Sequence, residues 1–248
     1  MFIAAQSTFA TYNMSEPQLP WLHVNQLDFP DVESAWDEPN GILAVGGDLS
    51  VARLVKAYCL GIFPWYNENE PILWWSPNPR CVLKPAEVRI TKSLKKTINK
   101  QKFTISFNQA FEDVVDNCAA PRKVLNDDEV GTWISDEMKQ AYLRLHQEGY
   151  AHSVEAWLEG ELVGGLYGLA IGKVFFGESM FSKVTDASKV AFVTLCKTLE
   201  YNEFKLIDGQ VYSPHLETLG FKLIPRTEFT QQLSTLTSPS EKTSFNLK

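Results

Sequence analysis

A chain of 248 residues is long enough to bury a substantial core, as one large domain or as two smaller ones. Its composition, 44% hydrophobic and 12% aromatic, is typical of a globular protein and excludes a wholly disordered chain. A formal net charge of −7 argues against a surface that is basic throughout, although a local basic patch would still attract phosphate.

The positions of the cysteines and histidines, and the lack of long apolar runs, bear on metal binding and on location in the cell. The four cysteines are scattered without a CxxC pair and the four histidines supply no metal-ligand spacing, so we expect reduced thiols and no metal. No apolar run approaches the roughly 20 residues that cross a bilayer, and the N-terminus lacks the features of a secretory signal. We therefore expect a cytoplasmic protein without a membrane partner, and a monomer.

The first part of the chain predicts a tail and a small domain. Residues 1–19 carry little periodic apolar pattern and are expected to be a tail, and residues 20–97 are expected to form a small N-terminal domain. Ser50 has the residue type of a helix N-cap, and the apolar spacing after it predicts a short helix that stops before Gly61. Prolines punctuate the next stretch, in which two short strands are expected between Ile72 and Leu83.

The segment RITKSLKKTINKQK, from Arg89 to Lys102, is basic and holds no acidic residue. A charge run of this kind is typical of a solvated helix face or a linker. In an acidic protein it is also a candidate contact for a phosphate backbone. The residues alone leave both interpretations open.

The second part of the chain alternates strand and helix signals. A strand in FTISF is followed by two helices, the second over about Asp136 to Gln147. Three extended runs with turn signals at Glu159-Gly160 and Gly172-Lys173 predict an antiparallel meander. Asp186 is expected to cap the next helix, and LIDGQV is expected to form a buried strand.

This element order resembles the GNAT (acyl-coenzyme A N-acyltransferase) fold. We therefore expect a mixed α/β (α+β) protein, with a small N-terminal domain, a GNAT-like domain over 98–230 and a Ser/Thr-rich tail over 231–248. Members of that fold bind the pyrophosphate of coenzyme A through backbone N–H groups of a Gly-rich loop. Here no glycine lies between Gly177 and Gly209, which disfavours coenzyme A.

Glu178, in FFGESMFS, lies near the end of the third meander strand among aromatic and thioether side chains. An arbitrary glutamate at a strand end is more often a solvated or capping carboxylate than a functional one. The apolar flanks of Glu178 indicate restricted water, and the next strand brings Asp208 and Gln210 at i and i+2, hence on one face. A buried acid on so apolar a strand needs a partner or a task.

Two further groups of residues each allow two interpretations. The aromatic side chains that precede the basic segment belong to the core or stack on a nucleobase; they are Trp65, Tyr66, Trp74 and Trp75. The glycines of LVGGLYG mark a strand bulge, or make room beside a bulky ligand.

The strings GILAVGGDLS, AYCLGIFPWY, PILWWSPNPR, GTWI, AHSVEAW, LVGGLYG, FFGESMFS and LIDGQ, in this order, resemble the leucyl/phenylalanyl-tRNA–protein transferase family. The resemblance covers about residues 29–229. It implies an enzyme that moves leucine or phenylalanine from aminoacyl-tRNA to the α-amino group of a protein with N-terminal Arg or Lys, which marks that protein for degradation. Methionine as a donor stays open. The resemblance also implies that the GNAT-like domain acts without coenzyme A or another cofactor.

By this resemblance, three polar residues form the reaction centre. Gln210 would hydrogen-bond the ester carbonyl or the attacking amine, and Asp208 would orient it or receive a proton. Glu178 would face the cationic acceptor residue, where a desolvated carboxylate favours Arg or Lys over neutral N-termini. An aminoacyl ester is already activated, so its aminolysis chiefly needs two substrates to be held in place.

The resemblance also implies residues that bind the charged tRNA. The donor side chain would enter an apolar pocket lined by Leu166, Met180, Phe192, Leu195 and Leu199, some of which are expected to be ordinary core. The aromatic positions around the terminal adenosine are Tyr58, Trp65 and Trp133. The candidates for contact with acceptor-stem phosphates are Lys92, Lys95 and Lys96.

One position departs from the family's pattern, and two other functions stay open. Gly209 stands where the family more often has cysteine, and because strand alternation points it away from Asp208 and Gln210 we expect no loss of mechanism. The alternatives are a coenzyme A-dependent N-acyltransferase and a non-catalytic protein that binds tRNA or a degradation signal.

Overall fold

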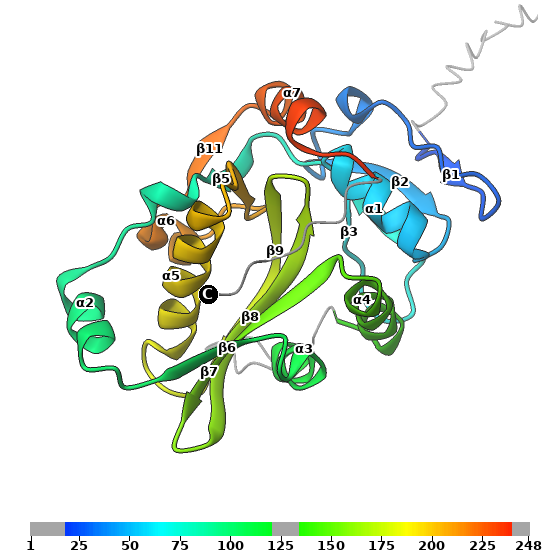
Figure 1. Cartoon of the computed structure of the whole chain (residues 1–248). Coiled ribbons are helices and arrows are strands. Elements are labelled where there is room, and N and C mark those ends of the chain that lie inside the picture. The colour runs from blue at the N-terminus through cyan, green and yellow to red at the C-terminus, as the bar shows by residue number, and fades with distance from the viewer. Residues whose placement is uncertain (1–17, 121–133, 240–248) are drawn as a thin grey trace, which may run out of the picture.

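The computed structural model describes residues 18–120 and 134–239, which form two β-sheets and the helices around them. The strands of the smaller sheet are β1 (Trp21–Leu22), β2 (Ile42–Gly46), β3 (Phe63–Pro64) and β4 (Leu73–Trp75). The strands of the larger sheet are β5 (Arg80–Leu83), β6 (Thr104–Phe107), β7 (Ala151–Leu158), β8 (Glu161–Ile171), β9 (Val174–Ser182), β10 (Leu206–Asp208) and β11 (Lys222–Ile224). The orders are β1-β2-β4-β3 and β11-β5-β10-β9-β8-β7-β6 (Figure 1).

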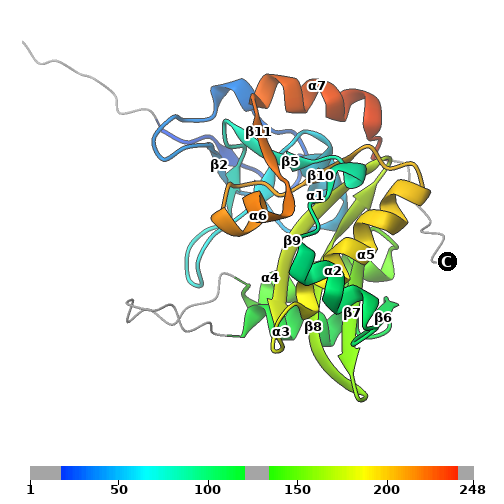
Figure 2. The ribbon, with the colours of Figure 1, turned by 90° about the vertical axis from the view of Figure 1, so that its left-hand side faces the viewer.

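The helices cover both faces of the larger sheet. They are α1 (Val51–Cys59), α2 (Lys92–Asn99), α3 (Phe111–Ala119), α4 (Asp136–Gln147), α5 (Ala187–Tyr201), α6 (Pro214–Leu219) and α7 (Arg226–Leu236). Helix α5 packs on one face of β7 and β8, whereas α3 and α4 lie on the other (Figures 1 and 2). Because both faces are covered, β8 is buried from Val163 to Ile171.

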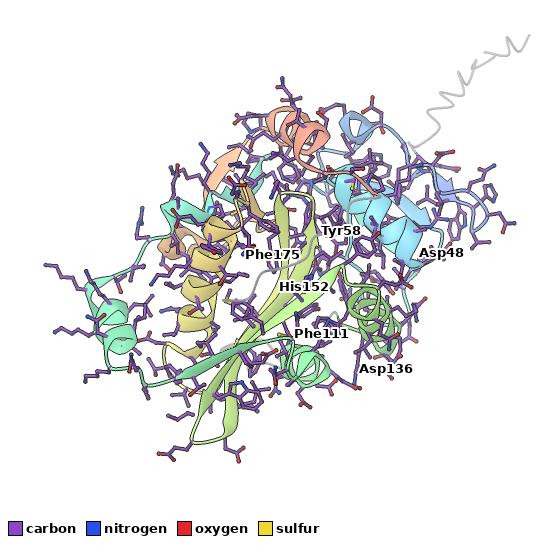
Figure 3. The ribbon with its side chains drawn as sticks, viewed as in Figure 1. Asp48, Tyr58, Phe111, Asp136, His152 and Phe175 are labelled. Atoms are coloured by element: carbon purple, nitrogen blue, oxygen red, sulfur yellow. The ribbon has the colours of Figure 1, made fainter. Side chains whose placement is uncertain are left out.

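Two apolar clusters form the core, one on each side of the larger sheet. The first joins α1, α3, α4 and the smaller sheet, and it contains Tyr58 (Figure 3). The second joins α5 to the opposite side of the sheet and contains Phe175, which Figure 3 also labels. Neighbouring residues of β9 alternate between the clusters, since Phe175 belongs to the second and Phe176 to the first.

The predicted meander is confirmed: β7, β8 and β9 pair in antiparallel order. Its first turn has positive φ at both Glu159 (54°) and Gly160 (87°), as a type I′ hairpin requires. The mixed α/β fold class with a small N-terminal domain is likewise confirmed. Within the described parts of the chain, no helix is long and apolar enough to cross a membrane.

The predicted starts of α1 and α5 are both confirmed, but the predicted cap hydrogen bond is present only at α1. The Ser50 hydroxyl caps α1 by accepting from the backbone N–H of Arg53 at 3.4 Å. Asp186 stands at the N-cap position of α5, but its side chain makes no cap hydrogen bond. Instead its carboxylate accepts from the Thr97 hydroxyl at 2.9 Å, which ties α2 to α5.

The folded parts of the chain differ from the expected boundaries. Strand β5 belongs to residues 20–97, yet it pairs with β10 and β11 of the larger sheet. The expected tail began at residue 231, but α7 continues to Leu236 and buries Leu233 completely. Residues 231–236 are therefore part of the folded domain. The Ser/Thr-rich composition suggested a tail, but the apolar face of α7 continues into this segment.

The glycines of LVGGLYG make room for neighbouring protein atoms. A Cβ on Gly164 would lie 2.6 Å from the Cβ of Ala187, so this glycine lets the start of α5 approach β8. A Cβ on Gly168 would lie 2.1 Å from the carbonyl oxygen of Phe176. The interpretation of these glycines as space for a ligand is therefore wrong; they allow close packing of α5 and β9 against β8.

Candidate active site

A cavity opens beside β9, where its pairing with β10 ends. The two parallel strands pair from Leu206 opposite Val174 to Asp208 opposite Phe176. Beyond this point β9 continues to Ser182, whereas the chain after β10 turns away at Gln210, whose φ is 58°. Residues from both strands line a cavity of about 390 Å³ that lies between them.

Glu178 lies at this opening and is held by three hydrogen-bond donors from three parts of the fold. The hydroxyl of Tyr58 on α1 donates to Oε1 at 2.8 Å, and the hydroxyl of Tyr142 on α4 donates to Oε2 at 2.5 Å. The Nε2 group of Gln210 donates to Oε1 at 2.9 Å. The tyrosine hydroxyls are also 2.8 Å from each other. Donors on both oxygens favour the ionised carboxylate.

Burial nevertheless holds the pKa of Glu178 well above that of an ordinary glutamate. Loss of hydration raises this pKa to about 7, the negative charge of Asp208 raises it too, and the three hydrogen bonds oppose the shift. Burial, followed by the nearby charge of Glu178, raises the pKa of the Tyr58 and Tyr142 hydroxyls well above 10.0. The tyrosines are therefore neutral donors at neutral pH, whereas the charge of Glu178 depends on the pH in that range.

Asp208 is fully buried, and nitrogen donors engage both of its carboxylate oxygens. Arg80 donates from Nε to Oδ1 at 2.8 Å and from Nη2 to Oδ2 at 2.7 Å. The backbone N–H of Gln210 donates to Oδ1 at 2.9 Å. A carboxylate with this many donors is suited to orienting its neighbours. Of the two roles predicted for Asp208, the contacts favour orientation over receipt of a proton.

The expectation that Asp208 and Gln210 share a strand face is wrong. Strand β10 ends at Asp208, and the left-handed backbone at Gln210 breaks the alternation on which that expectation depended. The two residues still belong to one hydrogen-bond network, because the Asp208 carboxylate accepts from the backbone N–H of Gln210 and the Gln210 amide donates to Glu178. They are joined by a hydrogen bond from the backbone of Gln210 to the side chain of Asp208, and not by two side chains on one strand face.

The cavity of about 390 Å³ is mainly apolar and includes three of the five residues predicted for the donor pocket. Leu166, Met180 and Phe192 line it, whereas Leu195 and Leu199 are buried core residues outside the lining. Sequence reasoning missed other lining side chains, namely Phe175, Ile207, Leu216 and Phe221. The alternation along β9 and β10 could have indicated Phe175 and Ile207, but the positions after Gln210 carry no periodic signal.

Gly209 lines the same cavity, contrary to the expectation that it faces away from the reaction centre. A Cβ at this position would lie 2.7 Å from the ring of Phe221 and 3.0 Å from Leu216. The ring of Phe221 stacks on that of Phe192, with centroids 5.8 Å apart. The Phe221 ring therefore occupies the space that a side chain at position 209 would need.

A second cavity, of about 280 Å³, meets the first at Glu178 and Gln210. Its other walls include Trp65, which is 45% exposed, and Tyr212, which is 47% exposed. Trp65 is thus accessible from this cavity, although its ring also contacts that of Trp75, with centroids 5.6 Å apart; its predicted stacking on adenine stays a prediction. Tyr58 is not accessible, because it is completely buried and its hydroxyl holds Glu178. Trp133 lies outside the described residues.

The predicted phosphate-binding lysines lie on the exposed side of α2. Leu94 is buried, whereas Lys92, Lys95 and Lys96 are exposed. Helix α2 stands beside α5 (Figure 2). The three charges therefore lie together on one solvent-facing helix.

The turn between β9 and α5 offers little to a pyrophosphate. The backbone N–H of Ala187 donates to the Val184 carbonyl at 3.1 Å, and that of Ser188 donates to the Ser182 hydroxyl at 3.3 Å. The Asp186 carboxylate adds negative charge at the same helix start. Occupied N–H groups beside an acid form a poor anion site, which argues against coenzyme A as a ligand.

The larger sheet, with an apolar cavity where two of its parallel strands part, defines a mixed α/β protein whose candidate site lies at that opening. The model of the family described as leucyl/phenylalanyl-tRNA protein transferase matches residues 82–234, and the model of that family's N-terminal domain matches residues 47–78. The chain belongs to the leucyl/phenylalanyl-tRNA protein transferase family.

Several relatives from this family align with most of the chain. The leucyl/phenylalanyl-tRNA–protein transferase of Nitrosospira multiformis is 52% identical over 90% of this chain and 94% of its own. That of Cellvibrio japonicus is 54% identical over 87% and 90%. Among solved structures, a GCN5-related N-acetyltransferase from Kribbella flavida is 12% identical, with a TM-score of 0.32 over 67% of this chain and 57% of that one. The family assignment rests on the sequence relatives.

Proposed function

We propose that the protein transfers leucine or phenylalanine from aminoacyl-tRNA to the α-amino group of proteins that begin with Arg or Lys. The transfer would mark the acceptor for degradation, in the cytoplasm where charged tRNA is made. The observation that carries this proposal is the position of Glu178 and Gln210, which are hydrogen-bonded to each other where two cavities meet. An aminoacyl-adenosine that spans the two cavities would place its ester bond beside this pair.

The reaction is the aminolysis of an ester. The acceptor nitrogen attacks the ester carbonyl carbon, a C–N bond forms, the bond to the ribose oxygen breaks, and that oxygen leaves with a proton. An α-amino group has a pKa near 8, so roughly a tenth is free base at pH 7. The site has to orient the substrates and remove one proton, which is a modest demand.

Each polar residue would have one task. The ionised Glu178 would attract the cationic acceptor, and this preference would be strong because its carboxylate is poorly hydrated. The Gln210 amide donates its N–H to Glu178, which leaves its oxygen to accept from the attacking amine. Asp208 would keep Gln210 in place. Methionine as a donor remains part of this proposal.

The two cavities suit the two parts of the aminoacylated terminal adenosine, the amino-acid side chain and the adenine base. The apolar cavity of about 390 Å³ would receive the leucine or phenylalanine side chain. Exposed Trp65, at the second cavity, would stack on the terminal adenine. Lys92, Lys95 and Lys96 would contact the acceptor-stem phosphates. Unoccupied N–H groups at the start of α5 would favour coenzyme A instead, but those of Ala187 and Ser188 are engaged.

The direct test is transfer of labelled leucine from Leu-tRNA to a peptide that begins with Arg. Absence of transfer with active tRNA and peptide would contradict the proposal, and tRNA binding without turnover would support a non-catalytic role. Asp208→Ala and Gln210→Ala should keep tRNA binding but slow transfer. A peptide that begins with Ala is the matched control, and titration with acetyl-coenzyme A tests the alternative acyl donor.

A further inference from the structure

Arg80, the first residue of β5, is a fully buried cation that joins three parts of the fold. Its Nε and Nη2 groups donate to the two oxygens of Asp208 on β10. Its Nη1 group donates to the carbonyl oxygen of Gly61, just after α1, at 3.0 Å. One guanidinium therefore spans the loop after α1 and the end of β10, which a planar fork of five N–H donors makes possible.

Two aromatic rings lie against this guanidinium. The ring of Phe63 lies with its centroid 4.9 Å from Cζ of Arg80, and that of Phe229 lies 4.7 Å away. Phe229 belongs to α7 and Phe63 to β3, so the last helix and the smaller sheet both contribute to the contact. A cation that is ion-paired and in contact with two rings has little freedom to rotate.

The contacts of Arg80 lead to Glu178 along two routes. On one route, Asp208 accepts from the backbone of Gln210, whose amide reaches Glu178. The neighbouring Cys81 N–H also donates to the Gln210 carbonyl at 3.2 Å. On the other route, the Gly61 carbonyl follows the end of α1, the helix that carries Tyr58 and so a second donor to Glu178.

We propose that Arg80 is the positioning residue of the reaction centre, which holds Gln210, and with it Glu178, in the geometry that transfer requires. Gln210 needs such support because its backbone has a φ of 58°, a left-handed conformation that residues other than glycine rarely adopt. Arg80 itself is completely buried and lines neither cavity that meets at Glu178. It therefore acts through Asp208 and Gln210, without touching substrate.

This inference rests on the proposed function, and Arg80→Lys tests it. Lysine keeps the charge but cannot donate side by side to both oxygens of Asp208 while it also reaches Gly61. We expect kcat for transfer to fall by about 10- to 100-fold, since small displacements of reacting groups have effects of this size. The KM for aminoacyl-tRNA should change by less than about threefold, because its binding contacts are elsewhere.

Arg53→Lys is the matched control. Arg53 is also fully buried, and its Nη2 group donates to the His23 carbonyl at 2.9 Å and to Asp48 at 3.2 Å, away from Asp208. Both variants should lower the melting temperature, but only Arg80→Lys should lower kcat when each is assayed well below that temperature. Equal kcat values in Arg80→Lys and Arg53→Lys would overturn the inference.

A double-mutant cycle with Gln210→Ala separates positioning from general support. If Arg80 acts through Gln210, Arg80→Lys should cost little further activity once the Gln210 amide is gone. Fully additive losses in kcat would overturn the inference, because they would mean that Arg80 acts only along the route that bypasses Gln210. If Arg80→Lys fails to fold, Phe229→Leu replaces it, because this variant removes one ring from the guanidinium. We expect its kcat to fall by about threefold, and we expect no further fall in the Gln210→Ala background. An inactive wild type would instead contradict the proposed function.

Discussion

At the scale of single residues, the site depends on how Glu178 balances burial against hydrogen bonding. Three donors favour its anion, and poor hydration opposes it, which leaves the pKa at about 7. An ordinary glutamate would be ionised throughout the physiological range. Glu178 instead changes charge near neutral pH, so the affinity of the site for a cationic acceptor should change there too.

The pH dependence of transfer should therefore have two components. As the pH rises through about 7, Glu178 loses its proton, and as it approaches 8, the acceptor amine does. Both changes increase kcat/KM for an Arg-initiated peptide, so its logarithm should rise with a slope that approaches 2 below pH 7. In Glu178→Gln the slope should not exceed 1, because only the amine still titrates.

A control variant identifies the source of that change. Glu137 on α4 also accepts from a tyrosine, Tyr66, at 3.3 Å, but it does not line either cavity. Glu137→Gln should keep the wild-type pH profile. If Glu178→Gln also kept it, the carboxylate would have no part in acceptor recognition.

At the scale of secondary-structure elements, α2 offers a test of tRNA binding that leaves the reaction centre intact. Lys95 and Lys96 are exposed on this helix, and Leu94 fixes it to the second cluster. Each lysine that contacts a phosphate releases counterions on binding. Lys95→Gln with Lys96→Gln should weaken tRNA binding and reduce the slope of log K against log salt concentration by about 1 per lost contact.

The matched control for α2 lies on the other face of the larger sheet. Lys139 on α4 pairs with Asp116 at 2.6 Å and with Glu112 at 3.2 Å. Lys139→Gln should leave the salt slope unchanged. An unchanged slope in the α2 variant as well would mean that its lysines form only a solvated helix face. Filter binding over a range of potassium concentrations measures both.

The elements also mark how far sequence reasoning could go. Periodicity predicted the meander and α4, because these elements are long and regular enough to repeat an apolar pattern. It failed at β10, where the strand ends after Asp208 and a left-handed residue follows. It also could not find Arg80, because a buried arginine pairs with an acid 128 positions away, and no local pattern records such a contact.

The resemblance to a family supplied the residues of the site, and the structure changed several of their roles. Tyr58 holds the carboxylate of Glu178 where stacking on adenine was expected. Leu195 and Leu199 belong to the core of α5 and not to the cavity. These corrections share a cause, since a sequence position shows which residue is present but not which side of a helix or strand faces the cavity.

At the scale of the whole molecule, α7 joins the two sheets. It lies beside the N-terminal part of the chain in both views (Figures 1 and 2). A Cβ on Gly61 would lie 3.4 Å from Leu233 of α7, and the Leu236 carbonyl accepts from the backbone of Lys173 at 2.8 Å. The end of α1 and the turn before β9 are thus both fixed by one helix.

Leu233→Ala should therefore destabilise the protein as a core substitution does. Removing this fully buried side chain should lower the free energy of unfolding by about 2–5 kcal/mol. Ser234→Ala, on the exposed side of the same helix, should change it by less than about 0.5 kcal/mol. Urea unfolding followed by tryptophan fluorescence measures both values. Similar results for the two variants would mean that α7 contributes little to the core.

The pairing of Gly209 with Phe221 constrains which side chains this cavity can accept. A cysteine introduced at 209 while Phe221 is present would place its Cβ 2.7 Å from a rigid ring that already stacks on Phe192. A smaller residue at 221, by contrast, is compatible with glycine at 209 and only enlarges the cavity. In this chain, a side chain at position 209 therefore requires either a shift of the Phe221 ring or a smaller residue at position 221.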